Sequence, residues 1–167
     1  MPGEAFRRVF WDIIAEVSAP SQTRAWRGGM LVSNSGVAVV IEDDTDIRGL
    51  ISQVLEQAGF LVYAASSGVD GIELVREHQP VVTTLDVSMP GIDGFETTRR
   101  LRALDLVPPP YIVALTANVM AEDRTSCEEA GMDAFLPKPI RLADLEACLT
   151  EFARRVGNPD LATDEEA

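Results

Sequence analysis

The sequence predicts an α/β protein: a doubly wound (βα)5 domain in which helices cover both faces of a five-stranded parallel sheet. One observation is the alternation of short apolar segments with longer segments whose apolar residues recur at helical spacing. A second is that four of the short apolar segments are followed at once by polar side chains. Alternating strands and helices indicate right-handed crossovers and a parallel sheet. Sites in such sheets lie at the carboxyl ends of the strands.

Local sequence patterns place the elements of this domain one by one. Residues 37–41 are continuously apolar, which is typical of a strand buried on both faces. Ile47 begins a helix with apolar residues at 50, 51, 54, 55 and 58, and Gly59 ends it. Pro80 ends the second helix, and the prolines at 108–110 require a loop. The predicted strands are 37–41, 60–64, 81–85, 111–115 and 133–136, and the predicted helices are 47–58, 67–78, 95–104, 119–130 and 141–155.

Further segments flank the predicted domain, which spans residues 37–156. In the N-terminal extension, residues 1–36, Phe6, Phe10, Ile13 and Val17 follow helical spacing, so we expect a short amphipathic helix and a linker. This helix either packs on its own domain or serves dimerisation or partner docking. Residues 157–167 are polar and acidic, and we expect them to be disordered.

Composition narrows the classes of partner. The formal net charge of −13 argues against nucleic acid or an anionic membrane surface, because both are bound through Lys and Arg. No segment approaches the roughly 18 apolar residues of a membrane span, and Asp12 and Glu16 interrupt the only candidate export signal. We therefore expect a cytoplasmic protein. Cys127 and Cys148 are expected to be reduced thiols.

Carboxylates follow two of the predicted strands. Glu42 and Asp43 end the first strand, and Asp86 ends the third. Adjacent carboxylates repel each other unless a cation lies between them, and Mg²⁺ prefers oxygen ligands. A neighbouring carboxylate can take a phosphoryl group as an acyl phosphate. The alternative is that these acids only favour helix N-termini or turns, as we expect of Asp44, which suits a helix cap.

Three further polar groups belong to the same predicted edge of the sheet. Thr116 ends the fourth strand, where an N-cap role is the alternative. Lys138 follows the fifth strand and is either a solvated charge or a partner for Asp86 or a phosphoryl oxygen. The Lys138–Pro139 bond is a candidate cis peptide. Ser88 follows Asp86 closely enough to offer its backbone carbonyl to a metal.

Four motifs stand at the predicted strand ends. They are VVIEDD at 39–44, LDVSMPGIDG at 85–94, ALTAN at 114–118 and GMDAFLPKPI at 131–140. Each motif is weakly specific by itself, but the four together in this order are very specific. Residues 37–155 thus resemble a response-regulator receiver domain of two-component signalling. The resemblance implies a flavodoxin-like fold and a phosphoacceptor role rather than enzymatic turnover of a substrate.

The resemblance also implies roles for individual residues. Asp86 would be the phosphoacceptor, and Glu42, Asp43, Asp86 and the Ser88 carbonyl would hold Mg²⁺. Glu42 replaces the more usual Asp, which places the metal through a water molecule. Thr116 and Lys138 would each bind a phosphoryl oxygen.

A conformational switch is a further implication of the resemblance. Thr116 would move toward the phosphoryl group, and Phe135 would rotate into the space it leaves. The face made by the fourth helix, the fifth strand and the fifth helix would change shape. Ser88 and Asn118 match positions that tune hydrolysis of the acyl phosphate.

The expected partners are a sensor histidine kinase or histidine phosphotransfer protein and a downstream protein target. A homodimer would form through the N-terminal helix or through the switch face. Met1 and the acidic end at Ala167 favour a stand-alone receiver, and the alternative is a receiver excised from a hybrid histidine kinase.

Two other classes of protein are weighed against the receiver. A phosphatase of the haloacid dehalogenase type would need a second acid where Ser88 stands. A flavodoxin-like cofactor binder would need a phosphate-binding loop where Glu42, Asp43 and Asp44 would repel phosphate.

Overall fold

The computed structural model describes residues 36–106, 109–117 and 121–157. The predicted N-terminal helix, Asn118 and the acidic tail after residue 157 lie outside the described residues. Among the described helices, none combines the length and apolar character that crossing a bilayer requires.

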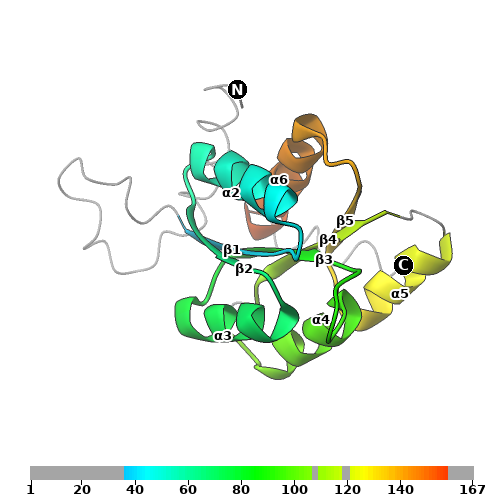
Figure 1. The fold of residues 1–167 in the computed structure, drawn as a ribbon. Helices are drawn as coiled ribbons and strands as arrows, with labels where there is room; N and C mark the ends of the chain where they lie inside the picture. The colour runs from blue at the N-terminus through cyan, green and yellow to red at the C-terminus, as the bar shows by residue number, and fades with distance from the viewer. Residues whose placement is uncertain (1–35, 107–108, 118–120, 158–167) are drawn as a thin grey trace.

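The predicted α/β architecture is confirmed. Five parallel strands form one sheet in the order β2-β1-β3-β4-β5, with the helices distributed over both faces (Figure 1). The strands are β1 Val37–Ile41, β2 Leu61–Ala65, β3 Val82–Asp86, β4 Tyr111–Thr116 and β5 Ala134–Pro137. The helices are α2 Thr45–Gln57, α3 Gly68–His78, α4 Gly94–Ala103, α5 Ala121–Ala130 and α6 Leu142–Gly157.

Most boundaries lie within one or two residues of the predicted ones, and the shift at β2 has a clear cause. Gly59, at φ +105°, donates its N–H to the Glu56 carbonyl (3.0 Å), and Phe60 donates to the Leu55 carbonyl (3.1 Å). This paired arrangement is the Schellman motif that ends a helix. Phe60 therefore belongs to the cap of α2, and the strand begins one residue later than predicted.

The sheet separates two apolar clusters. On the face covered by α2 and α6, strand residues such as Val40 and Val113 pack with helix residues such as Leu55 and Leu149. The other face, under α3, α4 and α5, buries Val39, Ile41, Leu85 and Ile112 with Val75, Leu101 and Cys127. Cys148 belongs to the first cluster and Cys127 to the second, so the sheet keeps these two buried thiols apart.

Strand β3 also contains two polar residues within this interior. Thr83 and Thr84 are completely buried, and within the described residues their hydroxyls have no hydrogen-bond partner. An unsatisfied buried hydroxyl costs about 1–3 kcal/mol. The strand that presents Asp86 is therefore not optimised for stability.

Close backbone approaches fix the helices beside the strand ends. A Cβ on Gly94 would lie 2.6 Å from the Asp86 carbonyl oxygen, and the Gly94 N–H donates to the Val87 carbonyl (2.9 Å). A Cβ on Gly71 would lie 2.3 Å from the Ile41 side chain, so α3 sits directly on β1. The start of α4 is thus held against the loop that leaves Asp86.

A partly buried network of hydrogen bonds around Arg102 ties α4 to the amino ends of β4 and β5. The Arg102 guanidinium donates to the Gly131 carbonyl (2.7 and 2.9 Å), the Pro110 carbonyl (2.8 Å) and Asp133 Oδ2 (2.7 Å). The same Asp133 oxygen accepts from the Ile112 N–H (2.8 Å). One side chain therefore joins three segments at the end of the sheet opposite the strand carboxyl termini.

Candidate metal and phosphoacceptor site

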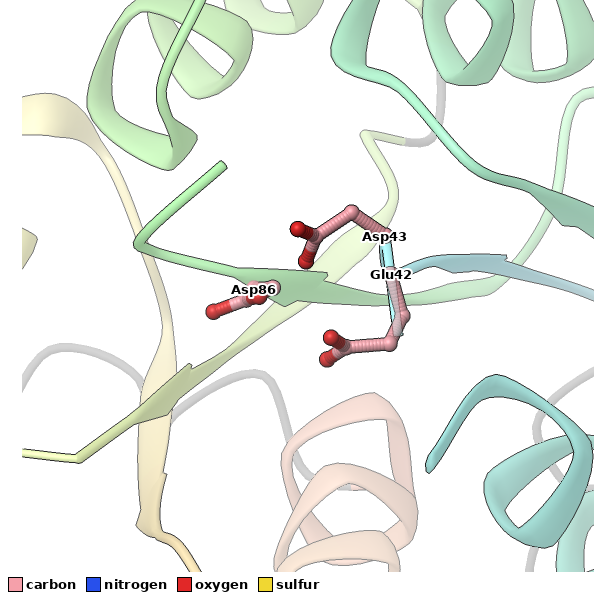
Figure 2. Close-up of side chains that lie close together, drawn as sticks. All are labelled: Glu42, Asp43 and Asp86. Carbon is pink, nitrogen blue, oxygen red and sulfur yellow. The ribbon is translucent and has the colours of Figure 1, made fainter. Parts of the chain in front are cut away.

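Three carboxylates converge at the carboxyl ends of β1 and β3. Glu42 and Asp43 leave the end of β1 in different directions, and both carboxylates turn toward Asp86 (Figure 2). One oxygen from each residue lies within 4.8 Å of the others. Glu42 and Asp86 are buried, whereas Asp43 is exposed. The cluster is therefore reached from solvent on the Asp43 side.

Asp44 does not join this cluster. Its side chain caps α2, accepting from the N–H groups of Asp46 (2.9 Å) and Ile47 (3.0 Å). The prediction that Asp44 is a helix cap is confirmed. The run of acids after β1 thus divides into a cap and two residues that face Asp86.

Among the residues that the structure describes, Lys138 is the one lysine whose ammonium contacts the carboxylate cluster. From the end of β5, its Nζ lies 3.2 Å from Asp86 Oδ2 and 3.3 Å from Glu42 Oε2. The backbone N–H of Lys138 donates to the Thr116 carbonyl (2.8 Å), and the Lys138–Pro139 peptide is cis. Lys138 thus reaches from the edge strand, past β4, to the ends of β3 and β1.

Burial and charge perturb the titration of this site. Burial, a hydrogen bond shared with Asp86 and the Asp86 charge raise the pKa of Glu42 to about 7, although the Asp44 N–H and Lys138 oppose the shift. Burial acts to lower the pKa of Lys138, but Asp86 and Glu42 outweigh it and the pKa is raised. One ammonium does not compensate three carboxylates. Additional positive charge would therefore stabilise the ionised form of Glu42.

The donor set fits a hard divalent cation. Glu42 Oε2 is buried and accepts no hydrogen bond from the part of the chain that the structure describes, although the Lys138 ammonium lies near it. An inward-facing carboxylate oxygen of this kind, with oxygens from Asp43 and Asp86 close by, suits Mg²⁺, which takes oxygen ligands and retains several waters. The residues present are therefore compatible with a magnesium site.

The loop after β3 orients Asp86. Asp86 Oδ1 accepts from the Ser88 N–H (3.1 Å), while Oδ2 faces Lys138. The Val87 N–H donates to the Leu115 carbonyl (3.0 Å), which anchors the loop on β4. Ser88 itself is exposed at the mouth of the site. The Asp86 carboxylate is thus held at both oxygens.

The two predicted switch residues lie on neighbouring strands. Thr116 is buried at the end of β4, and Phe135 is half-buried in β5. Arg124, an exposed residue of α5, places its guanidinium carbon 4.7 Å from the centroid of the Phe135 ring. The ring is therefore in contact with a helix of the face that the sequence predicts to change shape.

Sequence reasoning missed Arg48, a residue of α2 in contact with the backbone of the acidic pair. Its Nη1 donates to the Glu42 carbonyl (2.9 Å) and lies 3.4 Å from the Asp43 carbonyl. The available signal was an arginine placed one turn into the helix that follows the two acids.

The doubly wound sheet, with three carboxylates and a lysine at the carboxyl ends of its strands, defines a receiver domain of two-component signalling. The chain belongs to the response regulator receiver domain family, whose model matches residues 38–150. This membership favours the receiver over the phosphatase and cofactor-binding alternatives.

Individual relatives agree with this family. The chain is 36% identical over 125 residues to a sensor histidine kinase, RcsC of Salmonella typhi, covering 74% of this chain and 13% of RcsC. It is 40% identical over 117 residues to the transcriptional regulatory protein AfsQ1 of Streptomyces coelicolor, covering 70% of this chain and 51% of AfsQ1. The chain thus spans only part of these relatives.

A solved structure similar to this one is the receiver domain of the sensor histidine kinase PA1611 from Pseudomonas aeruginosa, which carries a magnesium ion coordinated in its active site cleft. The TM-score is 0.63 at 28% sequence identity, and the match covers 71% of this chain and 98% of that domain.

Proposed function

We propose that this receiver domain accepts a phosphoryl group on Asp86 and that the added charge changes the surface offered to a partner. The observation that carries the proposal is the position of Asp86. Its buried carboxylate lies 3.2 Å from the Lys138 ammonium, within the cluster formed with Glu42 and Asp43. That arrangement combines a nucleophile, a cation for the transferred group and ligands for a metal.

The chemistry is transfer of a phosphoryl group from a phosphohistidine. A carboxylate oxygen of Asp86 forms a bond to phosphorus as the phosphorus–nitrogen bond of the donor breaks, and the imidazole leaves. Lys138 then holds one oxygen of the transferred group, and the Thr116 hydroxyl holds another. When bound, Mg²⁺ neutralises charge on that group.

The metal ligands are Glu42, Asp43, Asp86 and the backbone carbonyl of Ser88. The first three are supported by the cluster of carboxylate oxygens and by the inward-facing Glu42 Oε2. Glu42 has one more methylene than aspartate, and it would hold the ion either directly or through a water molecule. Metal binding also displaces the proton that burial favours on Glu42.

The response to phosphorylation is a shift between two packings of the α5–β5–α6 face. The phosphoryl group adds about −1.5 to −2 charges and three acceptor oxygens beside the end of β4. Thr116 moves toward these oxygens, and Phe135 turns inward from its half-buried position. The reorientation separates the ring from Arg124, so the packing of α5 against β5 differs between the phosphorylated and unphosphorylated forms of Asp86.

The phosphoryl donor is a sensor histidine kinase or a histidine phosphotransfer protein, and the phosphorylated face docks a downstream protein. The domain acts as a phosphoacceptor in the cytoplasm rather than as an enzyme with its own substrate, and neither nucleic acid nor a membrane is its partner. Because RcsC is a sensor histidine kinase and AfsQ1 a transcriptional regulatory protein, the similarity supports both a separate regulator and a domain of a hybrid kinase.

The functional unit spans residues 37–156, preceded by the extension 1–36 and followed by the tail 157–167. A homodimer would use the extension or the α5–β5–α6 face. Solution mass measured before and after deletion of residues 1–35 distinguishes these surfaces, because dimerisation through the extension is lost with it.

The test is intact mass after incubation with acetyl phosphate, with and without Mg²⁺. The wild-type protein is expected to gain one Mg²⁺-dependent phosphoryl adduct, and Asp86→Asn none. Asp44→Asn is the matched control, because asparagine caps a helix as well as aspartate does and the Asp44 side chain accepts from the first N–H groups of α2 rather than joining the cluster. An adduct that persists in Asp86→Asn, or a wild-type protein that gains none from acetyl phosphate or a phosphohistidine donor, would refute the proposal.

A further inference from the structure

Arg48 contacts the backbone that presents both acids of the cluster. Its Nη1 donates to the Glu42 carbonyl (2.9 Å) and lies 3.4 Å from the Asp43 carbonyl, while Nη2 lies 3.5 Å from Thr45 Oγ1. The guanidinium is always protonated and forms a planar fork, so these contacts are charge-assisted and independent of pH near neutrality.

The position of the two carbonyls explains why they need a side-chain donor. The Glu42 N–H makes the bond from the end of β1 to the Ala65 carbonyl of β2 (3.0 Å). The backbone hydrogen bonds of α2 start at the Asp44 carbonyl, which accepts from the backbone N–H of Arg48 (2.9 Å). The carbonyls of Glu42 and Asp43 therefore lie between sheet and helix, and Arg48 joins this peptide to the first turn of α2.

The side chains of the same peptide are constrained from the other direction. Glu42 Oε1 accepts from the Asp44 N–H (3.2 Å) and lies 3.4 Å from Lys138 Nζ. Asp43 is exposed, and rotation of its peptide would carry its carboxylate away from Asp86. The direction of Asp43 thus depends on a backbone that Arg48 holds in place.

We propose that Arg48 is a positioning residue for the Mg²⁺ site, an inference that rests on the proposed function. It fixes the Glu42–Asp43 peptide so that both carboxylates face Asp86 before the ion arrives. The positive charge of Arg48 acts in the opposite sense, because it repels a cation. The contacts recorded for Arg48 in this peptide are to carbonyls rather than to carboxylate oxygens, so it leaves the ligands available and the positioning effect dominates.

Two substitutions separate positioning from charge. Arg48→Gln removes both the charge and the fork, and Arg48→Lys keeps the charge but loses the fork. Arg76→Gln is the matched control, because Arg76 is an exposed helical arginine of α3 whose partner is Glu73. Isothermal titration calorimetry measures Mg²⁺ affinity, and the urea midpoint without Mg²⁺ verifies that each variant is folded.

We expect Mg²⁺ to bind about tenfold more weakly to both Arg48 variants, which is the usual size of the effect when a residue supporting a metal ligand is lost. Arg76→Gln binds Mg²⁺ as wild type does. In the acetyl phosphate reaction, the variants need more Mg²⁺ for half-maximal rate, and their rate at saturating Mg²⁺ returns to the wild-type value. A general loss of structure would lower that saturated rate as well.

Unchanged or tighter Mg²⁺ binding by Arg48→Gln would overturn the inference, because it would mean that charge repulsion outweighs positioning. Wild-type affinity in Arg48→Lys would also overturn it, since a charge without the fork would then suffice. If Arg48→Gln does not fold, Arg48→Lys decides alone by the same criterion. A wild-type protein without a Mg²⁺-dependent adduct would instead contradict the proposed function.

Discussion

The buried carboxyl of Glu42 predicts how the stability of the metal-free protein depends on pH. In the folded protein the pKa of Glu42 is raised from 4.5 to about 7, first by burial and then by Asp86. Because the folded state holds this proton more tightly than the unfolded state, the stabilisation is complete below pH 4.5 and is lost as pH rises through 7. At about 1.4 kcal/mol per unit, the change amounts to about 3 kcal/mol.

Urea denaturation in the presence of a chelator, at intervals from pH 4.5 to 8, measures this effect. Other groups titrate in the same range, so the relevant quantity is the difference between wild type and Glu42→Gln, which has nothing to ionise at that position. Asp44→Asn serves as the control for changing an acid outside the cluster. Wild type is expected to lose about 3 kcal/mol more than Glu42→Gln across this range.

Magnesium provides a second readout of the same linkage. If Mg²⁺ binds at ionised Glu42 as proposed, adding it above pH 7 is expected to stabilise wild type by RT ln(1 + [Mg²⁺]/Kd), so the gain rises with the logarithm of the Mg²⁺ concentration. Parallel pH profiles for wild type and Glu42→Gln in the absence of Mg²⁺ would refute the reasoning, because Glu42 would then ionise normally in the folded protein.

Three further substitutions test the packing that supports the site, each by urea denaturation. Thr84→Val is expected to stabilise the protein by about 1 kcal/mol, because it replaces an unsatisfied buried hydroxyl with a methyl group of similar shape; a loss of stability would indicate a partner for that hydroxyl. Arg102→Lys should lower the free energy of unfolding by about 2 kcal/mol, since one ammonium does not reproduce the contacts to two carbonyls and Asp133. A change within about 0.5 kcal/mol, the size expected of an ordinary surface substitution, would argue against the network. Gly71→Ala should destabilise by about 1–3 kcal/mol through the clash with Ile41, and a neutral result would mean that this side chain moves aside at little cost.

The sheet and the members of the acidic cluster could be predicted because each leaves a local trace in the sequence. The alternation of continuous apolar segments with segments of helical spacing indicates the order of strands and helices. Polar residues immediately after the strands indicate that the site lies at the carboxyl ends of the strands. Asp44 was separable from Glu42 and Asp43 because it occupies the cap position of the next helix. These features depend on neighbours in the chain.

The features that the sequence did not reveal depend on specific three-dimensional contacts that neither apolar periodicity nor residue type indicates. Phe60 is as apolar as the strand that follows it, and its place in a helix cap depends on a hydrogen bond to Leu55. Arg48 looks like any arginine in a surface helix until its distance to the Glu42 carbonyl is known. Similarly, the contact between Arg124 and Phe135 joins two elements that the sequence alone does not orient.

The Arg102 network has a consequence for how movement is distributed along the edge of the sheet. It fixes the amino ends of β4 and β5, while the carboxyl end of β5 contacts the site through Lys138. Because the contacts at its carboxyl end involve Asp86, we expect phosphorylation to displace that end of β5 more than the end held by Arg102. Amide hydrogen exchange should thus change on phosphorylation near Leu136 and stay constant at Ile112, whose N–H is held by Asp133.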